Sequence, residues 1–178
     1  MSILKFLRFE SAPVSHSSDE TETVRKIVSA LDQLDPDRAK FIAAFAYLLS
    51  RVARADLTIA PQETAEMERI VMQQGGLPEE QAILVVQMAK TQNILFGATE
   101  NYLVTREFNK MASHEQKLGL LHCLFAVTAS DESISTVEDN EVSQIADELR
   151  IEHGEFIDVR SRFRAHLAVL KKPDKSAD

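Results

Sequence analysis

Several residue types that mark particular classes of protein are scarce in this chain. A single cysteine, Cys123, among 178 residues excludes an internal disulfide framework. Its neighbour His122 points to a different side of the same predicted helix, and no Cys-x-x-Cys or His-Glu-x-x-His spacing occurs, so no zinc site is expected. No apolar run is long enough to span a membrane or resembles a secretory signal. We therefore expect a cytoplasmic protein.

Glycine and proline are also scarce, with 5 of each, and no long polar tract interrupts the chain. Internal disorder is therefore not expected, and a hydrophobic content of 44% is enough for one core. Basic residues are outnumbered, because 20 Lys and Arg against 28 Asp and Glu give a net charge of -8. This balance argues against nucleic-acid binding, which needs a basic footprint. A neutral or cationic partner is expected instead.

What the sequence does contain is an internal duplication. The stretch Arg54–Glu66 recurs further along the chain as Ala129–Glu141, at a constant offset. The matched pairs are Phe45 and Leu120, Leu49 and Leu124, Asp56 and Asp131, Ile59 and Ile134, Glu63 and Glu138, and Glu66 and Glu141. A fixed self-similarity indicates that one supersecondary unit was built twice and packed against itself.

Apolar residues at helical spacing predict about eight helices, and no stretch alternates in the way that a strand requires. The predicted fold is all-α, a compact helical bundle built from two duplicated helix-loop-helix units. Asp35 before Pro36 marks one helix start, Ser113 with Gln116 forms a capping pattern at another, and Gly75–Gly76 ends a helix.

The last predicted helix is defined by apolar residues from Phe156 to Leu170 at helical spacing. With it, the domain organisation is predicted as follows. Residues 1–18 form an N-terminal segment and linker, residues 19–172 form one helical domain, and residues 173–178 form a disordered tail.

The repeated stretch forms two acidic loops. In each copy a helix ends at an Asp, a short loop carries one Ile inward, and a Glu lies in the first turn of the next helix. A carboxylate at a helix C-terminus faces the negative end of the helix dipole, which costs roughly 0.3–1 kcal/mol. A divalent cation shared by Asp56 with Glu63, and by Asp131 with Glu138, would offset this cost through oxygen ligands. Calcium, magnesium and manganese are the candidates.

A purely structural role for both loops is the alternative. An Asp can accept the backbone N–H two residues further on, and Ser135 with Glu138 forms a complete capping box. Ala60 offers no cap in the first copy, so Glu63 is the better ligand candidate. The loops do not follow the EF-hand pattern, because its twelfth position holds Met67 or Val142 instead of Glu.

With these loops and their flanks, the chain resembles the TerB-like, tellurite-resistance-associated domain family, in its bacterial branch. The resemblance spans roughly residues 38–170 and rests on AYLLSRVARAD with the later Glu63, on NYLVTREFNKMASHEQKLGLL, and on LFAVTASDESISTVEDNEVSQIADEL followed by EFIDVRSR. It implies a compact α-helical bundle and a role in stress-linked ion sensing or scaffolding. The carried-over ligands are Asp56, Glu63, Asp131 and Glu138. The family has Gly after each Asp, where this sequence has Leu57 and Glu132.

No Gly-rich phosphate loop follows a strand, and no nucleophile, base and orienting group can be assembled from local motifs. We therefore predict that the chain is not an enzyme. The predicted function is a non-enzymatic interaction or scaffold module with a protein partner, and the alternative is a divalent-cation-binding regulatory module.

Two segments are candidates for contact with that partner, one basic and one apolar. Arg160, Arg162 and Arg164 make the last helix basic, which indicates either a solvated face or a docking site for an acidic partner. Residues 1–9 are mostly apolar with two basic residues. They are predicted to dock on the core or on a neighbouring chain, with a weak membrane contact as the alternative.

Overall fold

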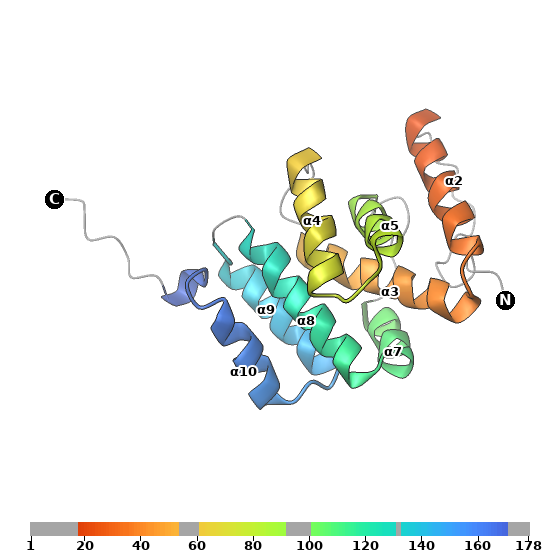
Figure 1. Cartoon of the computed structure of the whole chain (residues 1–178). Helices are drawn as coiled ribbons and strands as arrows, with labels where there is room; N and C mark the ends of the chain where they lie inside the picture. Colours follow the sequence, from red (N-terminus) through yellow and green to blue (C-terminus); the bar gives the residue numbers. More distant parts are fainter. Residues whose placement is uncertain (1–17, 54–60, 92–100, 131–132, 171–178) are drawn as a thin grey trace.

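The computed structural model describes residues 18–53, 61–91, 101–130 and 133–170, and its elements are helical (Figure 1). The α-helices are, in chain order, α2 (Ser18–Asp32), α3 (Pro36–Val52), α4 (Pro61–Gln73), α5 (Glu79–Lys90), α7 (Asn101–Met111), α8 (His114–Ala129), α9 (Thr136–Glu148) and α10 (His153–Arg162), followed by the short 3-10 helix η2 (Ala168–Leu170). The predicted all-α class is confirmed. No helix in these ranges is both long and apolar enough to cross a membrane.

Helix α3 forms the centre of the bundle. Every residue from Phe41 to Val52 is buried, and α3 packs against α5, α7, α8 and α9. A helix that is covered on all sides must be apolar around its whole circumference or have its polar groups satisfied. The Phe108 ring of α7 packs on this helix, with its centroid 5.2 Å from that of Phe41 and 6.3 Å from that of Phe45. Arg51 is the single charged residue in this buried stretch.

The two predicted copies pack across each other. Helix α3 of the first copy contacts α9 of the second, and α4 contacts α8. The matched residues Leu49 and Leu124 are fully buried, and Ile134 is buried as well. Its counterpart Ile59 lies outside the described residues, so the duplication itself stays a prediction.

The predicted helix ends at Asp35, Ser113 and Gly75–Gly76 are confirmed. Asp35 Oδ1 accepts the backbone N–H of Asp37 at 2.9 Å, and Ser113 forms a capping box with Gln116. Helix α4 is followed by Gly76 at a φ of 64°, the left-handed conformation that glycine adopts without a steric penalty. Helix α9 is followed by Arg150 at a φ of 58°, a conformation that is unfavourable for a residue with a Cβ atom.

Replacing Arg150 by glycine is therefore expected to raise the free energy of unfolding by about 0.5–1 kcal/mol. The gain is smaller than the full left-handed penalty, because glycine also increases the entropy of the unfolded chain. Urea denaturation followed by circular dichroism measures it. The matched control is Arg164→Gly, at an exposed arginine whose φ is not positive, and it should destabilise the protein. A loss of stability in Arg150→Gly would contradict the prediction.

The last helix is shorter than predicted. The apolar spacing continues to Leu170, but α10 ends at Arg162 and turns follow. Phe163 stacks on Phe125 of α8, with ring centroids 5.6 Å apart and an interplanar angle of 16°. This contact holds Phe163 just beyond the end of α10, against the side of α8.

Residues 163–170, here called the C-terminal segment, return to the loop between α8 and α9. Leu167 and Ile134 form an isolated parallel β-bridge. The Ile134 N–H donates to the carbonyl of His166 at 2.7 Å, and the Ala168 N–H donates to the carbonyl of Ile134 at 2.9 Å. The bridge requires an extended backbone at Leu167, which is why a helix cannot continue through this residue.

Candidate functional site

The structure describes only part of the predicted cation site. Asp56 and Asp131 lie outside the described residues, and so does the side chain of Glu63, although α4 passes through this position. Glu138 is described, and its carboxylate accepts the N–H of Ser135 at 2.8 Å while the Ser135 hydroxyl accepts the N–H of Glu138 at 3.2 Å. The predicted capping box is confirmed. Within the described ranges, no three His, Cys, Asp or Glu side chains gather in a way that would hold a metal ion.

A cation site through Asp56 and Glu63 stays a prediction, and thermal melting tests it. A ligand at a hundredfold excess over its dissociation constant stabilises the fold by about 2.7 kcal/mol, or roughly 5–10 °C at this chain length. We expect such a shift in calcium, magnesium or manganese relative to chelator. Asp56→Asn with Glu63→Gln should abolish the shift, whereas Asp131→Asn with Glu138→Gln should retain most of it. No shift with any of these ions would contradict the prediction.

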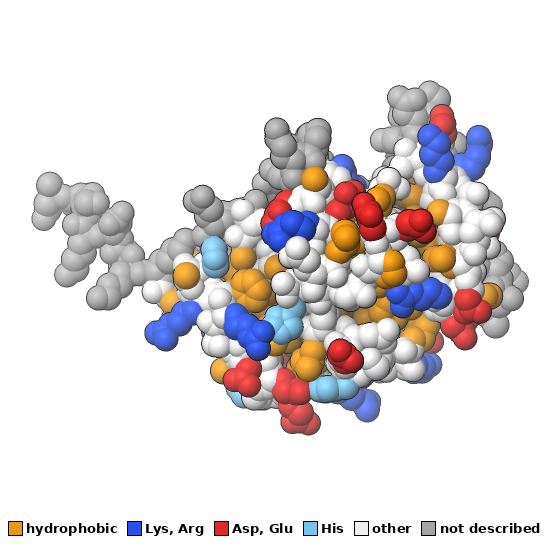
Figure 2. Space-filling model, in the orientation of Figure 1, with side chains coloured by type: hydrophobic (Ala, Val, Ile, Leu, Met, Phe, Trp, Pro, Cys, Tyr) orange, Lys and Arg blue, Asp and Glu red, His pale blue; other side chains and the backbone are white. Residues whose placement is uncertain are grey.

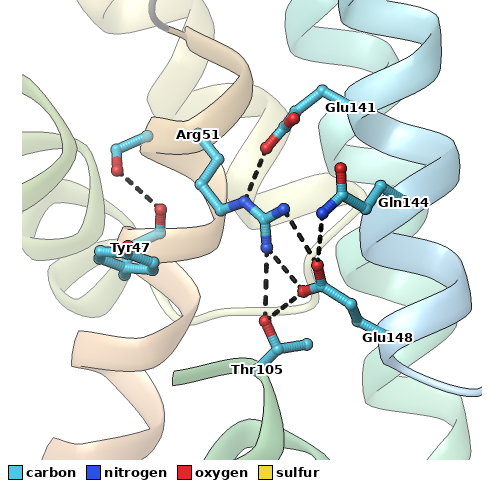
Figure 3. Close-up of polar contacts among 7 residues, drawn as sticks. Tyr47, Arg51, Thr105, Glu141, Gln144 and Glu148 are labelled. Atoms are coloured by element: carbon cyan, nitrogen blue, oxygen red, sulfur yellow. Dashed lines mark hydrogen bonds and ion pairs between the residues drawn. The ribbon is translucent and has the colours of Figure 1, made fainter. Parts of the chain in front are cut away.

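A buried ion network centred on Arg51 joins three helices (Figure 3). The side chain of Arg51 is only 1% exposed. Its Nε donates to Glu141 Oε1 at 2.7 Å, while Nη1 and Nη2 donate to the two carboxylate oxygens of Glu148 at 2.8 and 3.3 Å. Thr105 of α7 donates its hydroxyl to Glu148 at 2.6 Å. The network therefore connects α3, α7 and α9.

Helix α9 supplies its share of the network from one face. Glu141, Gln144 and Glu148 are three and four residues apart, so their side chains lie on the same side of the helix, as Figure 3 shows. Gln144 donates its amide N–H to Glu148 Oε1 at 3.0 Å, and Asn109 of α7 donates to the backbone carbonyl of Glu148 at 3.2 Å. Throughout the described ranges, each buried side-chain nitrogen and oxygen has a hydrogen-bond partner.

The network keeps its charges despite burial. Burial works against the charged form of Glu148, but the hydrogen bonds from Arg51 and Thr105 outweigh it and lower the pKa of this carboxyl. Burial also opposes the charge on Arg51, whose pKa is nevertheless raised by its bonds to Glu148 and Glu141. The Arg51 guanidinium and the Glu148 carboxylate are therefore ionised at neutral pH, and the network holds three helices in register.

The lowered pKa of Glu148 predicts that the protein loses stability in acid. A glutamate in an unfolded chain has a pKa of about 4.3, so below this value the unfolded state binds more protons than the folded state. The contribution of Glu148 is therefore complete above about pH 4.3 and disappears as the pH falls through the lower, folded pKa.

Urea unfolding at a series of pH values checks this expectation. The free energy of unfolding should fall less steeply with decreasing pH in Glu148→Gln than in the wild type. Asp147→Asn is the matched control, because Asp147 is the exposed neighbour on the same helix, and it should keep the wild-type slope. Identical slopes in the wild type and Glu148→Gln would contradict the assignment.

Sequence reasoning did not find this network. Glu141 appeared only as the counterpart of Glu66, and Arg51 was not singled out. One available signal was the position of Arg51 inside an apolar helical stripe, and another was the seven-residue spacing that places Glu141 and Glu148 on one helix face. Neither signal names the partner, because the charges come from helices far apart in the chain.

The family model described as "Tellurite resistance protein TerB" matches residues 41–161, which is more than half of the chain. The chain belongs to the TerB family. The resemblance predicted from the sequence is thus confirmed. The match of this TerB domain includes Arg51, Thr105, Glu141 and Glu148, whereas α2 and the C-terminal segment lie outside it. No curated protein and no solved structure matches the chain.

Proposed function

We propose that this TerB domain is a non-enzymatic interaction module, associated with the stress response, that docks a protein partner at one end of its bundle. The observation that carries the proposal is that three exposed apolar residues, Val137, Val169 and Leu170, lie on the two segments joined by the Ile134–Leu167 bridge; they are here called the bridge patch. Their exposed fractions are 78%, 59% and 49%. Single exposed apolar residues are ordinary on a protein surface, but a group of them marks an interaction site.

The β-bridge brings together the two segments that carry these three residues. Val137 follows Ile134 by three residues, and Val169 follows Leu167 by two, so the Ile134–Leu167 bridge sets both segments side by side. In Figure 1, η2 lies next to the end of the bundle where α8 leads into α9. Val137 has no role in capping α9, because Ser135 and Glu138 form the cap. The start of the helix therefore does not explain an exposed valine at this position.

The described interior supports a structural role for the rest of the bundle. The Arg51 guanidinium is buried and already bonded to Glu141 and Glu148, so it is not placed to bind a substrate. Burial raises the pKa of the Cys123 thiol to about 12. A thiol that stays protonated at neutral pH is a poor nucleophile, so Cys123 is expected to be inert in the folded protein.

Affinity purification of the full chain from cells, after chemical crosslinking, tests the proposal. The wild type should retain partner proteins that the bridge-patch variant Val137→Asp with Val169→Asp loses. Ile157→Asp is the matched control, because Ile157 is an exposed apolar residue of α10 outside the patch, and it should retain the same partners. Recovery of an unchanged set of proteins with the patch variant would overturn the proposal.

A further inference from the structure

Two exposed arginines lie close in the chain to the C-terminal part of the bridge patch. Arg162 is the last residue of α10, and Arg164 lies in the C-terminal segment, three residues before the bridged Leu167. Both are exposed, and no acidic side chain of the described residues forms an ion pair with either. These two arginines lie on or next to the C-terminal segment, which carries Val169 and Leu170 of the bridge patch, in a chain whose net charge is -8.

The neighbouring Arg160, by contrast, forms an ion pair within the protein. Its Nε and Nη2 donate to the two carboxylate oxygens of Asp139, at 2.8 and 2.6 Å, and so fasten α10 to α9. Arg160 is thus a structural residue. Among the described residues, Arg162 and Arg164 have no such partner, and both are exposed.

Acidic residues lie along the first part of α10, up to the exposed Asp158 in its middle. Glu152 and Glu155 lie at its beginning, and the arginines lie at and beyond its end. Figure 2 shows basic and histidine side chains beside hydrophobic ones over the far end of α10 and over α8, with acidic side chains where α10 begins. The helix dipole favours a cation in the last turn, which accounts for Arg162. It does not account for Arg164, which lies past the end of the helix.

The α8 side of this surface adds a polar group without adding charge. Burial and the nearby guanidinium of Arg162 lower the pKa of His122, so this half-buried ring is neutral at physiological pH. The cations that the described surface presents to a partner here are therefore Arg162 and Arg164. Lys171 and Lys172 follow in the sequence, outside the described residues.

We propose that the segment recognised at this end of the bundle is acidic and amphipathic, with carboxylates opposite Arg162 and Arg164 and apolar side chains on the bridge patch. The inference rests on the proposed function and specifies the chemistry of the partner. Arginine suits this task, because its planar guanidinium binds a carboxylate through two parallel hydrogen bonds. The partner's negative charge would match the two arginines of this surface, which gives specificity and faster association.

Binding of a synthetic peptide tests this chemistry. The probe is a fluorescently labelled amphipathic peptide of Glu and Leu, and the matched probe has Gln in place of every Glu. Fluorescence anisotropy with the full chain should show binding of the Glu peptide and weaker or absent binding of the Gln peptide. Affinity should fall between about 0.01 M and about 0.15 M salt, because the screening length shortens from roughly 30 Å to roughly 8 Å.

Charge reversal locates the site. Arg162→Glu with Arg164→Glu should weaken binding of the Glu peptide by about tenfold or more. Arg162→Lys with Arg164→Lys should bind more tightly than the reversed variant. The matched control is Arg25→Glu with Lys26→Glu, the same charge change on α2 at the opposite end of the molecule in Figure 1, and it should bind within about twofold of the wild type.

Three outcomes would overturn the inference. One is equal binding of the two peptides, and another is full binding by the reversed variant. The third is that the surface serves another occupant. A concentration-dependent dimer in sedimentation velocity would show this, and so would flotation with phosphatidylcholine–phosphatidylglycerol vesicles. In either case the effect is lost in the reversed variant, and the Glu peptide does not bind. If the bridge-patch variant still loses partners in the crosslinking experiment, the interaction module stands and only the acidic partner is rejected.

Discussion

Replacing Arg51 by methionine is expected to lower the free energy of unfolding by about 3–5 kcal/mol. Methionine fills much of the space but leaves Glu141 and Glu148 without their cation inside the bundle. The side chain of Glu148 is only 16% exposed and that of Glu141 30%, so water replaces little of what is lost. Urea denaturation monitored by circular dichroism gives the value.

Two further variants separate the loss of the ion pairs from a general effect of removing an arginine. Arg69→Met removes an exposed arginine that pairs with Glu66 within one helix turn, and it should cost less than about 1 kcal/mol. Arg51→Met combined with Glu141→Leu and Glu148→Leu should recover most of the loss, because an apolar replacement of a whole buried ion network is often neutral. A loss below about 1 kcal/mol in Arg51→Met would show that the network contributes little.

Truncating either of two matched core leucines is the other change with a large expected effect. Leu49→Ala and Leu124→Ala should each lower the free energy of unfolding by about 2–5 kcal/mol, since both side chains are fully buried and alanine leaves a cavity. Chemical denaturation measures both. Val137→Ala is the control, at a valine that is 78% exposed, and it should change stability by less than about 0.5 kcal/mol.

The size of these losses carries information on the packing. Leu49 lies on the central helix α3 and Leu124 on α8, and the two helices pack on each other. Comparable losses at both positions are expected if the two copies use them alike. Losses below about 1 kcal/mol at either leucine would mean that its surroundings collapse to fill the space.

The helices and their ends were predictable from the sequence, because the interactions that set them are local. Ser135 and Glu138 are three residues apart, and this spacing alone lets each satisfy a backbone group of the other. The proline after Asp35 and the glycine at position 76 act through their own backbone preferences in the same way. Apolar residues at helical spacing from Phe41 to Val52 likewise indicate a buried helix face, and this stretch of α3 is buried.

The end of α10 was not predictable from the same rules. Apolar residues continue at helical spacing to Leu170, so the pattern alone favours a continuous helix. The ring of Phe163 stacks on that of Phe125 instead. The backbone on either side of Leu167 forms hydrogen bonds with Ile134, which lies more than thirty residues earlier in the chain. Such contacts override a helical propensity that differs little between residues.

The candidate sites divide in the same manner. The sequence determined by itself that the chain is an all-α bundle of the TerB family, because helical periodicity and family motifs depend on residues close together in the chain. Only the tertiary structure decided that Arg51 pairs with Glu141 and Glu148, and that Ile134 pairs with Leu167. Charge pairing and surface exposure depend on which helices meet, and helices that are distant in the chain meet only after the core has packed.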